Sequence, residues 1–365
     1  MDKRDEASRA YHYRGSFHLH SNYSDGTGTF KEIAMSAKKA GLDFLIVTDH
    51  RTLQPLRDGL SGYIDDVLIL VGYEIGDERD KNHLIALDLK KEVPRNTPPL
   101  EYVKAVSKDG GIGIIAHPYD SGTNIPQFKS HEWDNWDVKD FDGIEIWNYM
   151  MQWLNGLSPA NKLFRFLFPN LRVSRPSGKA VSLWDELNRE RKVFGIFATD
   201  NHGYPVRFMN KELKIFPYVN LFKTLRIHVL LSEPLSPDGG IAQAQVNKAI
   251  REHRFYNSDF RHGDAYGFEF NLICPGQNGS DHSPVGSTVI FSDGCSIQVR
   301  APKTSGIKIF REGKLLKNYP FSRTVNYRVE SPGIYRVECH RYGRIWIMSN
   351  NIYILKKFGT NPVKY

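Results

Sequence analysis

The stretch that decides the fold runs Phe17-His18-Leu19-His20-Ser21-Asn22-Tyr23-Ser24-Asp25-Gly26. His18 and His20 are two residues apart, so in a β-strand both imidazoles point to the same face. Asp25 follows after a short polar loop, in which Gly26 can adopt a positive φ and turn the chain back. Imidazole and carboxylate ligands together suit zinc, iron or manganese. Two histidines in one strand more often form a solvated face, so a metal site needs further ligands from the rest of the chain.

Length and composition are those of a globular protein. The chain has 365 residues, enough for one large α/β domain and a smaller second one. The N-terminal stretch lacks the apolar core of a signal peptide, and no window approaches the roughly 18 apolar residues of a membrane span. The three cysteines, Cys274, Cys295 and Cys339, are expected to be reduced packing residues, although one pair among them stays possible. We therefore expect a cytoplasmic protein with no membrane partner.

The net charge of +8 suits an anionic substrate or nucleic acid. Lysine and arginine are spread along the chain with acids interleaved, so a solvated basic surface explains the charge more simply. We expect a small anionic substrate, with nucleic acid as a less favoured partner. The sequence does not decide the oligomeric state.

Apolar runs of β-forming residues alternate with amphipathic helical segments over the first 260 residues or so. This order is typical of β-α-β units in a largely parallel sheet. From about residue 264 short strands follow one another, separated by Gly, Pro, Ser and Asn, which favours a small antiparallel β-sandwich. The predicted organisation is a flexible N-terminus at 1–14, an α/β domain at 15–263 and a β-sandwich domain at 264–365.

Acids and histidines follow the predicted strands. His50, Glu74, His117 and the Asp200/His202 pair each come just after an apolar run, whereas His83 stands at the start of its strand. The C-terminal ends of parallel strands gather at one rim, where such folds bind ligands. Ordinary strand ends would carry Ser, Asn, Lys and Gly instead. The candidate metal ligands are therefore His18, His20, Asp25, His50, Glu74, His83, His117, Asp200 and His202.

This set is too large for one metal, because a catalytic zinc takes three protein ligands and keeps a position for water. It would fill two or three sites, with Glu74 able to bridge two of them. Two metals about 3.5–4 Å apart lower the pKa of a bridging water and stabilise attacking and leaving oxygens, which suits phosphoester hydrolysis. Two members have simpler explanations: His83 as a satisfied strand histidine, and Asp25 as an Asx-turn or cap. Glu145, near another strand end, is expected to orient a histidine ligand.

The segments HLHSNYSDG, TDH, GYE, AHP and TDNH resemble, in order and context, those of the PHP (polymerase and histidinol phosphatase) superfamily of metal-dependent hydrolases. The resemblance covers roughly residues 15–260 and implies a distorted (β/α)7 TIM-like barrel with a bi- or trinuclear centre at its C-terminal rim. It implies three ligand groups: His18, His20, Glu74 and Asp200; then Asp25, His50 and Glu74; then His83, His117 and His202. The C-terminal section resembles the β-sandwich of the carbaryl-hydrolase-type branch.

We expect a metal-dependent phosphoesterase that acts on a small phosphorylated metabolite or nucleotide, with two or three Zn, Mn or Fe ions and a metal-bridging hydroxide as nucleophile. Catalytic roles are expected for Glu74, His117, His202 and Arg51. The two alternatives are an amide, carbamate or ester hydrolase at the same centre and a regulatory protein that keeps metal without catalysis.

Substrate contacts are expected from cations near the predicted rim. Arg51 directly follows His50, and a loop of Pro, Gly and Ser carries Arg172, Arg175 and Lys179. Arginine binds phosphate oxygens through two parallel hydrogen bonds, which suits such a loop to an anionic substrate. An exposed, solvated loop is an equally good explanation.

Overall fold

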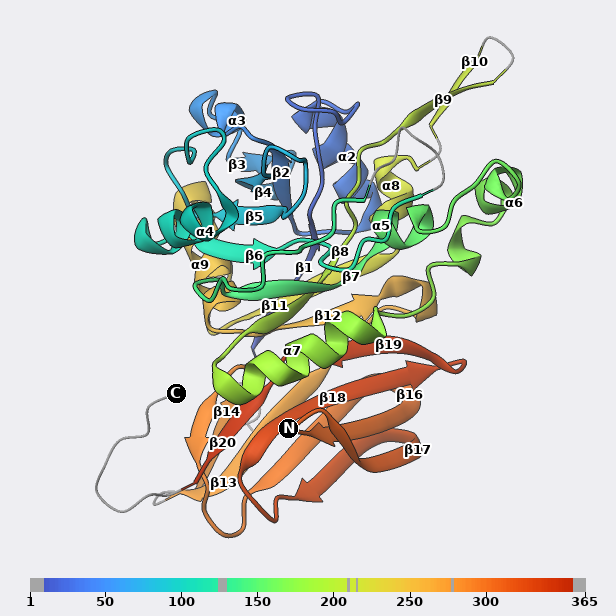
Figure 1. The fold of residues 1–365 in the computed structure, drawn as a ribbon. Helices are drawn as coiled ribbons and strands as arrows, with labels where there is room; N and C mark the ends of the chain where they lie inside the picture. Colours follow the sequence, from blue (N-terminus) through green and yellow to red (C-terminus); the bar gives the residue numbers. More distant parts are fainter. Residues whose placement is uncertain (1–9, 124–129, 209–210, 215, 277–278, 357–365) are drawn as a thin grey trace.

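The structure is a computed structural model that describes residues 10–123, 130–208, 211–214, 216–276 and 279–356. A layered α/β region occupies the upper half of Figure 1, and a region of strands from the C-terminal third lies beneath it. No helix among the described residues is long and apolar enough to cross a membrane.

Within the described residues, seven strands of the α/β region form a closed ring. In ring order they are β1 (Tyr11–Phe17), β2 (Phe44–His50), β4 (Val67–Ile75), β5 (Leu84–Leu87), β6 (Ile112–Ile115), β7 (Gly143–Asn148) and β8 (Phe194–Ala198). The ring closes where the N–H groups of Thr199 and Asp200 donate to the carbonyls of Phe17 and His18, at 3.0 and 2.8 Å. Strand β5 runs antiparallel to both neighbours and the other ring pairings are parallel. The predicted distorted barrel is therefore present, with one reversed strand.

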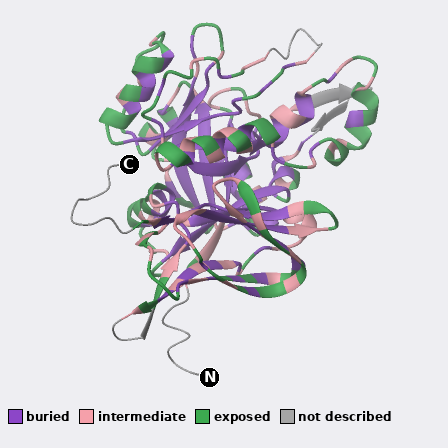
Figure 2. Ribbon diagram, turned by 60° about the horizontal axis from the view of Figure 1, so that its bottom comes forward, coloured by how far each residue is buried: buried purple, intermediate pink, exposed green. Residues whose placement is uncertain are grey.

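Alternate residues of the ring strands enter two separate cores, as an inside and an outside require. Phe17, Ile46 and Ile114 belong to the inner core. Neighbours such as Val47 and Ile115 pack outward. The outer core includes side chains of the helices α2 (Phe30–Ala40), α4 (Pro99–Lys108), α5 (Tyr149–Leu154) and α7 (Gly178–Glu190). In Figure 2 the ring strands are almost wholly buried.

The N-terminal half of β1 also pairs with β11 (Leu225–Leu231), and this strand with α9 (Gly239–Arg251) completes the inner core. Because of this pairing β1 begins at Tyr11, so the predicted flexible segment is wrong for residues 11–14; residues 1–9 lie outside the described part. Smaller elements complete the region: α3 (Gln54–Arg57), β3 (Gly62–Ile64), α6 (Lys162–Leu167), η1 (Pro169–Leu171), β9 (Pro205–Phe208), β10 (Lys211–Lys214), α8 (Tyr218–Leu221), β12 (Phe255–Asp259) and η2 (Phe260–His262).

Local sequence signals explain where α2 and α7 begin. Thr29 caps α2 in a reciprocal capping box with Glu32, and Gly41 ends the helix in the left-handed conformation. Ser177 caps helix α7, because its side chain accepts a hydrogen bond from the Ala180 N–H.

The C-terminal region is a β-sandwich built of eight strands within the described residues. They are β13 (Glu269–Gly276), β14 (Gly279–Pro284), β15 (Thr288–Ile290), β16 (Ser296–Arg311), β17 (Lys314–Arg328), β18 (Gly333–Arg341), β19 (Arg344–Ser349) and β20 (Ile352–Leu355). Strand β16 alternates between buried and less buried residues along most of its length, as a strand with one face on a core should. The described pairings among these strands are antiparallel, as predicted for this region, apart from β15 and β20, which run parallel.

The two regions share hydrogen bonds and an ion pair. Strand β12 pairs with β19. The guanidinium of Arg336 on β18 makes a bidentate contact with Asp185 on α7, at 3.0 and 3.1 Å. The predicted boundary near residue 264 falls between η2 and β13.

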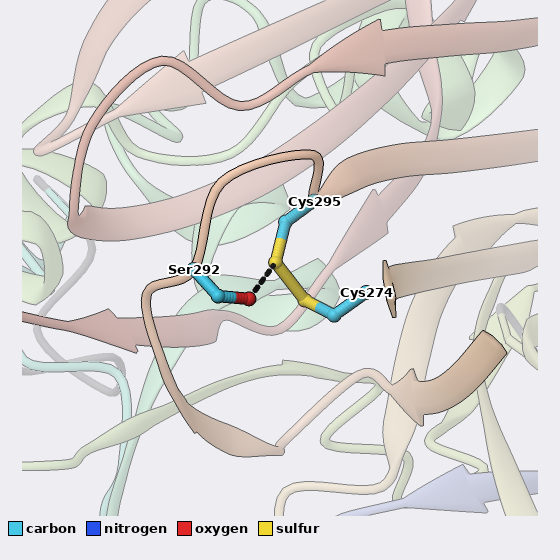
Figure 3. Close-up of a disulfide and its surroundings, with 3 residues drawn as sticks. All are labelled: Cys274, Ser292 and Cys295. Atoms are coloured by element: carbon cyan, nitrogen blue, oxygen red, sulfur yellow. Dashed lines mark hydrogen bonds between the residues drawn. A yellow bond between two sulfur atoms is a disulfide. The ribbon is translucent and has the colours of Figure 1, made fainter. Parts of the chain in front are cut away.

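Two of the three cysteines, all within the described ranges, form a disulfide, which corrects the expectation of reduced packing residues. Cys274 on β13 and Cys295 just before β16 lie side by side because Ile273 pairs with Ser296, and their Cα atoms are 4.1 Å apart. Ser292 Oγ donates to Cys295 Sγ at 3.2 Å (Figure 3). Cys339 is buried with a free thiol. The sequence could not choose this pair, since the strand register decides it. The cytoplasmic location, which rested partly on reduced thiols, stays a prediction.

Candidate metal centre

The nine predicted ligands lie together at one rim of the ring. His18 and His20 follow β1, His50 ends β2, Glu74 lies near the end of β4, His117 follows β6, and Asp200 and His202 follow β8. His83 precedes β5, and the reversed direction of β5 brings the start of this strand to the same rim as the ends of the others. The position of His83 in the sequence, which looked exceptional, thus follows from the topology.

The backbone is turned sharply at three of these residues. His18, His117 and Asp200 have positive φ angles of 62°, 26° and 53°. Non-glycine residues rarely adopt this region, and such strain collects at functional sites where the surrounding structure holds it.

Glu74 is the centre of the cluster, and its two carboxylate oxygens face different histidines. Oε2 lies 3.2 Å from His18 Nε2, 3.3 Å from His20 Nε2 and 3.2 Å from His50 Nδ1, so Glu74 also contacts the histidine of the second implied group. Oε1 lies 2.8 Å from His83 Nδ1 and 3.2 Å from His117 Nε2. Two ligand atoms that are each about 2.1 Å from one metal are separated by about 3.0–3.4 Å. The geometry is therefore that of a carboxylate that can bridge two metal positions.

Asp200 completes the first of these groups. Its Oδ1 lies 3.4 Å from His18 Nε2 and 3.4 Å from His20 Nε2. The first implied group, with Glu74 and these three residues, is thus brought together as the resemblance implies.

A third group surrounds Asp25. Its Oδ1 lies 3.4 Å from His202 Nε2, 3.6 Å from His50 Nε2 and 3.8 Å from His20 Nδ1. The resemblance implied that His202 would lie with His83 and His117 as the third ligand of one metal. In the structure His202 lies beside Asp25 instead, and the residue beside both His83 and His117 is Glu74.

Several ring nitrogens of the cluster make no hydrogen bond of suitable geometry among the described residues, although carboxylate oxygens lie near some of them: both of His20, Nδ1 of His83 and Nδ1 of His117. A buried polar atom without a partner costs free energy, so such atoms require an explanation. Their carboxylate neighbours supply negative charge, and a divalent cation between nitrogen and carboxylate would satisfy both. The residues present therefore fit a metal.

The pKa shifts of His20, Glu74 and His18 also agree with a metal bound among these residues. Burial lowers the pKa of His20 to about 3, and the neighbouring His202 and His50 act in the same direction. A neutral imidazole is the form that binds metal. Burial alone would raise the pKa of Glu74, but His18, His83 and His50 hold it well below its usual value. Burial would lower the pKa of His18, yet Asp200, Glu145 and Glu74 raise it, and this negative field also favours a cation.

Glu145 holds two of the histidines from behind, as expected. Its Oε1 lies 2.6 Å from His18 Nδ1, and its Oε2 accepts the His117 backbone N–H at 2.8 Å and the Asn148 side-chain N–H at 2.9 Å. Asp49 has a similar role that the sequence did not reveal: it accepts hydrogen bonds from Ser21 N–H, Ser21 Oγ and Ser24 Oγ. These bonds fix the loop that carries Asp25.

A cavity of about 660 Å³ opens over the cluster. Arg51 lines it, as expected, and so do Arg95, His131 and Tyr204, which sequence reasoning missed because no motif marks them. His131 Nδ1 donates to the Asp80 carbonyl at 2.6 Å, and Tyr204 stacks on His202 with ring centroids 4.7 Å apart.

The predicted substrate-binding residues Arg172, Arg175 and Lys179 are not among the described residues that line this cavity. Lys179 lies in α7 with its Nζ 6.0 Å from the Tyr119 ring, and Arg172 and Arg175 are exposed. The sequence placed them near the rim by their position before β8, but the direction of a side chain depends on tertiary packing.

Residues 16–115 match the family model of the PHP domain. An uncharacterized protein of Methanocaldococcus jannaschii is 28% identical over 149 residues, which are 37% of this chain and 81% of that protein. A solved two-domain protein from Bacteroides vulgatus, which contains a predicted PHP-like metal-dependent phosphoesterase, matches 94% of this chain and 95% of its own at 14% identity and a TM-score of 0.45. An amidohydrolase from Chromobacterium violaceum with bound sulfate matches 52% of this chain and 87% of its own at 13% identity and a TM-score of 0.30. The similarity of the C-terminal region to the carbaryl-hydrolase-type branch stays a prediction. The matched segment, residues 16–115, contains the HLHSNYSDG, TDH and GYE motifs on which the resemblance to the PHP superfamily rests.

Proposed function

We propose that this protein is a metal-dependent phosphoesterase that hydrolyses a small phosphorylated metabolite or nucleotide. The observation that carries the proposal is the position of Glu74, whose Oε2 faces His18, His20 and His50 and whose Oε1 faces His83 and His117, at 2.8–3.3 Å. A carboxylate in this position would be able to hold two cations.

The nine residues divide into three ligand groups. His18, His20, Glu74 and Asp200 would hold one ion, Glu74 with His83 and His117 a second, and Asp25 with His50 and His202 a third. Two or three Zn, Mn or Fe ions bound there would lower the pKa of a coordinated water and neutralise charge on substrate oxygens. Glu74, His117 and His202 therefore serve the reaction as ligands.

The protein's own cations fit an anionic substrate. Arg51 Nη2 donates to the Asp77 carbonyl at 3.1 Å and lies 3.7 Å from Asp80, which holds its side chain beside the cavity. Arg95 lines the same cavity. Guanidinium groups in a partly desolvated site bind phosphate oxygens and stabilise charge that develops on them. A small phosphoester within about 660 Å³ can contact both the ligand cluster and these arginines.

Metal analysis tests the ligand groups independently of turnover. Elemental mass spectrometry should find two or three metal ions per chain in the protein reconstituted with Mn or Zn. His20→Ala removes a ring with both nitrogens facing the cluster, so the variant should lose at least one equivalent and its activity. His282→Ala, on an exposed residue of β14, is the matched control and should keep both. Lost turnover in the His20 variant with full metal content would refute the assignment.

A substrate panel tests the reaction class. We expect the metal-replete protein to hydrolyse p-nitrophenyl phosphate or a phosphodiester, and chelation to abolish the activity until metal is restored. Hydrolysis of a carbamate or ester without any phosphoester would overturn the proposal in favour of carbonyl chemistry at the same centre. Absence of turnover across the metal-replete panel would overturn it in favour of a regulatory protein.

A further inference from the structure

The segment of α6 and η1 exposes an unusual number of apolar side chains. Within the described residues, 18 large hydrophobic side chains are exposed, and six of them fall between residues 163 and 171. These six form the apolar patch: Leu163, Phe164, Phe166, Leu167, Phe168 and Leu171. Leu163 and Leu167 are 71% and 64% exposed. A contiguous apolar surface of this kind marks a place where a partner binds.

Helix α6 buries a charged residue and exposes its apolar ones, the reverse of a helix that packs on a core. Its buried residue is Arg165, which is 2% exposed and donates through Nη1 to the carbonyls of Trp153 and Asn155, at 2.5 and 2.9 Å. A surface helix normally buries its apolar residues and exposes its charges. Here the buried arginine fixes the helix to α5 and leaves the phenylalanine and leucine side chains in water.

The charge around the patch has one sign. Residues 146–184 contain no Asp or Glu, although acids make up 41 of the 365 residues, so a stretch of this length would ordinarily hold several. The same stretch carries five Lys and Arg residues, and four of them are exposed: Lys162, Arg172, Arg175 and Lys179. These cations do not line the cavity, and two of them, Lys162 and Arg172, directly flank the apolar patch in the chain and give it a basic border.

The position of the apolar residues and the charge beside them bear on the kind of partner. Leu163, Phe164, Phe166 and Leu167 lie on the side of the six-residue helix opposite Arg165, and Phe168 follows at the C-cap of the helix. A protein groove binds one stripe of a longer helix. A second copy of this chain would place arginine opposite arginine, because a two-fold interface repeats the same patch. A bilayer accepts apolar side chains from every side, and its anionic headgroups attract the basic border.

We propose that the apolar patch docks the protein on an anionic membrane surface. Figure 1 shows α6 standing out from the body of the protein, to which it is connected through α5, the helix that follows β7. Met151 and Leu154 of α5 line the cavity over the ligand cluster. Docking through α6 therefore brings the cavity close to the bilayer. The absence of a spanning segment among the described residues is compatible with this, since interfacial docking needs only a short apolar segment with cations beside it.

Vesicle sedimentation of the full chain tests the proposal and needs no catalytic activity. The protein should bind vesicles of phosphatidylcholine mixed with phosphatidylserine, more weakly in high salt, and bind poorly to phosphatidylcholine alone. The double variant L167S/F168S should partition at least about tenfold more weakly. R172Q/R175Q should lose about fivefold per removed charge on the anionic vesicles. Both variants alter exposed residues, and unchanged thermal unfolding should show that the fold is retained.

Matched controls lie on the β-sandwich. Phe321 is 86% exposed, and Lys314 and Lys317 are also exposed, so F321S and K314Q/K317Q change similar chemistry away from the patch. They should bind the vesicles as the unaltered protein does. No binding of the unaltered protein to anionic vesicles would overturn the proposal. So would full binding by L167S/F168S, equal losses in the sandwich controls, or a dimer in solution that L167S/F168S dissociates.

Discussion

Glu145→Gln is the sharpest test of how the fold prepares the ligand cluster. Glu145 is buried and lies behind the ligands, with Oε1 2.6 Å from His18 Nδ1 and Oε2 accepting from His117 N–H and the Asn148 amide. Glutamine has nearly the same shape but replaces one acceptor oxygen by an NH2 donor. The substitution therefore changes hydrogen bonding without opening a cavity.

Either orientation of the new amide is unfavourable. If the NH2 group takes the place of Oε2, the His117 and Asn148 donors lose their acceptor, at about 1–3 kcal/mol each. If it takes the place of Oε1, His18 Nδ1 must accept, which moves the ring proton to Nε2. His18 Nε2 is the atom that faces Glu74 and Asp200 at 3.2 and 3.4 Å, so this tautomer cannot bind metal there. Loss of such an orienting carboxylate typically weakens metal binding by about 10–100-fold.

The assay is a competitive titration of metal-free protein against a chelator of known affinity. Glu101→Gln, on an exposed residue in the first turn of α4, is the matched control and should leave the affinity unchanged. Thermal unfolding of both variants checks that the fold is intact. A Glu145→Gln protein that is folded and binds metal as tightly as the control would refute the orienting role of this carboxylate.

Three further predictions concern the stability of the fold. Arg336→Met leaves buried Glu338 and partly buried Asp185 without their shared guanidinium partner and should lower the free energy of unfolding by about 3–5 kcal/mol in urea denaturation; a loss below about 1 kcal/mol would contradict a buried ion pair at Arg336. Replacing Cys274 and Cys295 by serine opens a loop of 21 residues and should cost about 3 kcal/mol under oxidising conditions; equal stability of the two proteins would argue against the bond. A Cβ at Gly143 would lie 2.0 Å from a phenylalanine ring in the barrel interior, so Gly143→Ala should cost about 1–3 kcal/mol, seen as a lower Tm; an unchanged Tm would contradict this close packing.

Much of the barrel and its rim could be predicted from the sequence, because the relevant signals are local. Side chains two residues apart share a face of a strand, which made His18 and His20 a pair before any fold was known. Runs of β-formers alternating with capped helices indicate parallel strands, and the ends of parallel strands meet. Acids and histidines directly after such runs were therefore expected at a common rim, and the structure brings all nine together.

Only the tertiary structure decided which of these residues lie together in one ligand group. His83 reaches the rim because β5 is reversed, and His202 turns toward Asp25 because of the backbone after β8. The disulfide depends on the register of two strands that meet through long-range pairing. Arg172 and Arg175 carry the right charge for a phosphate, but packing of α6 and η1 directs them to the surface, while unmarked Arg95 lines the cavity. Residue type and spacing are local properties of a chain, whereas side-chain direction and partner follow from contacts between segments far apart in sequence, and these exist only in the folded protein.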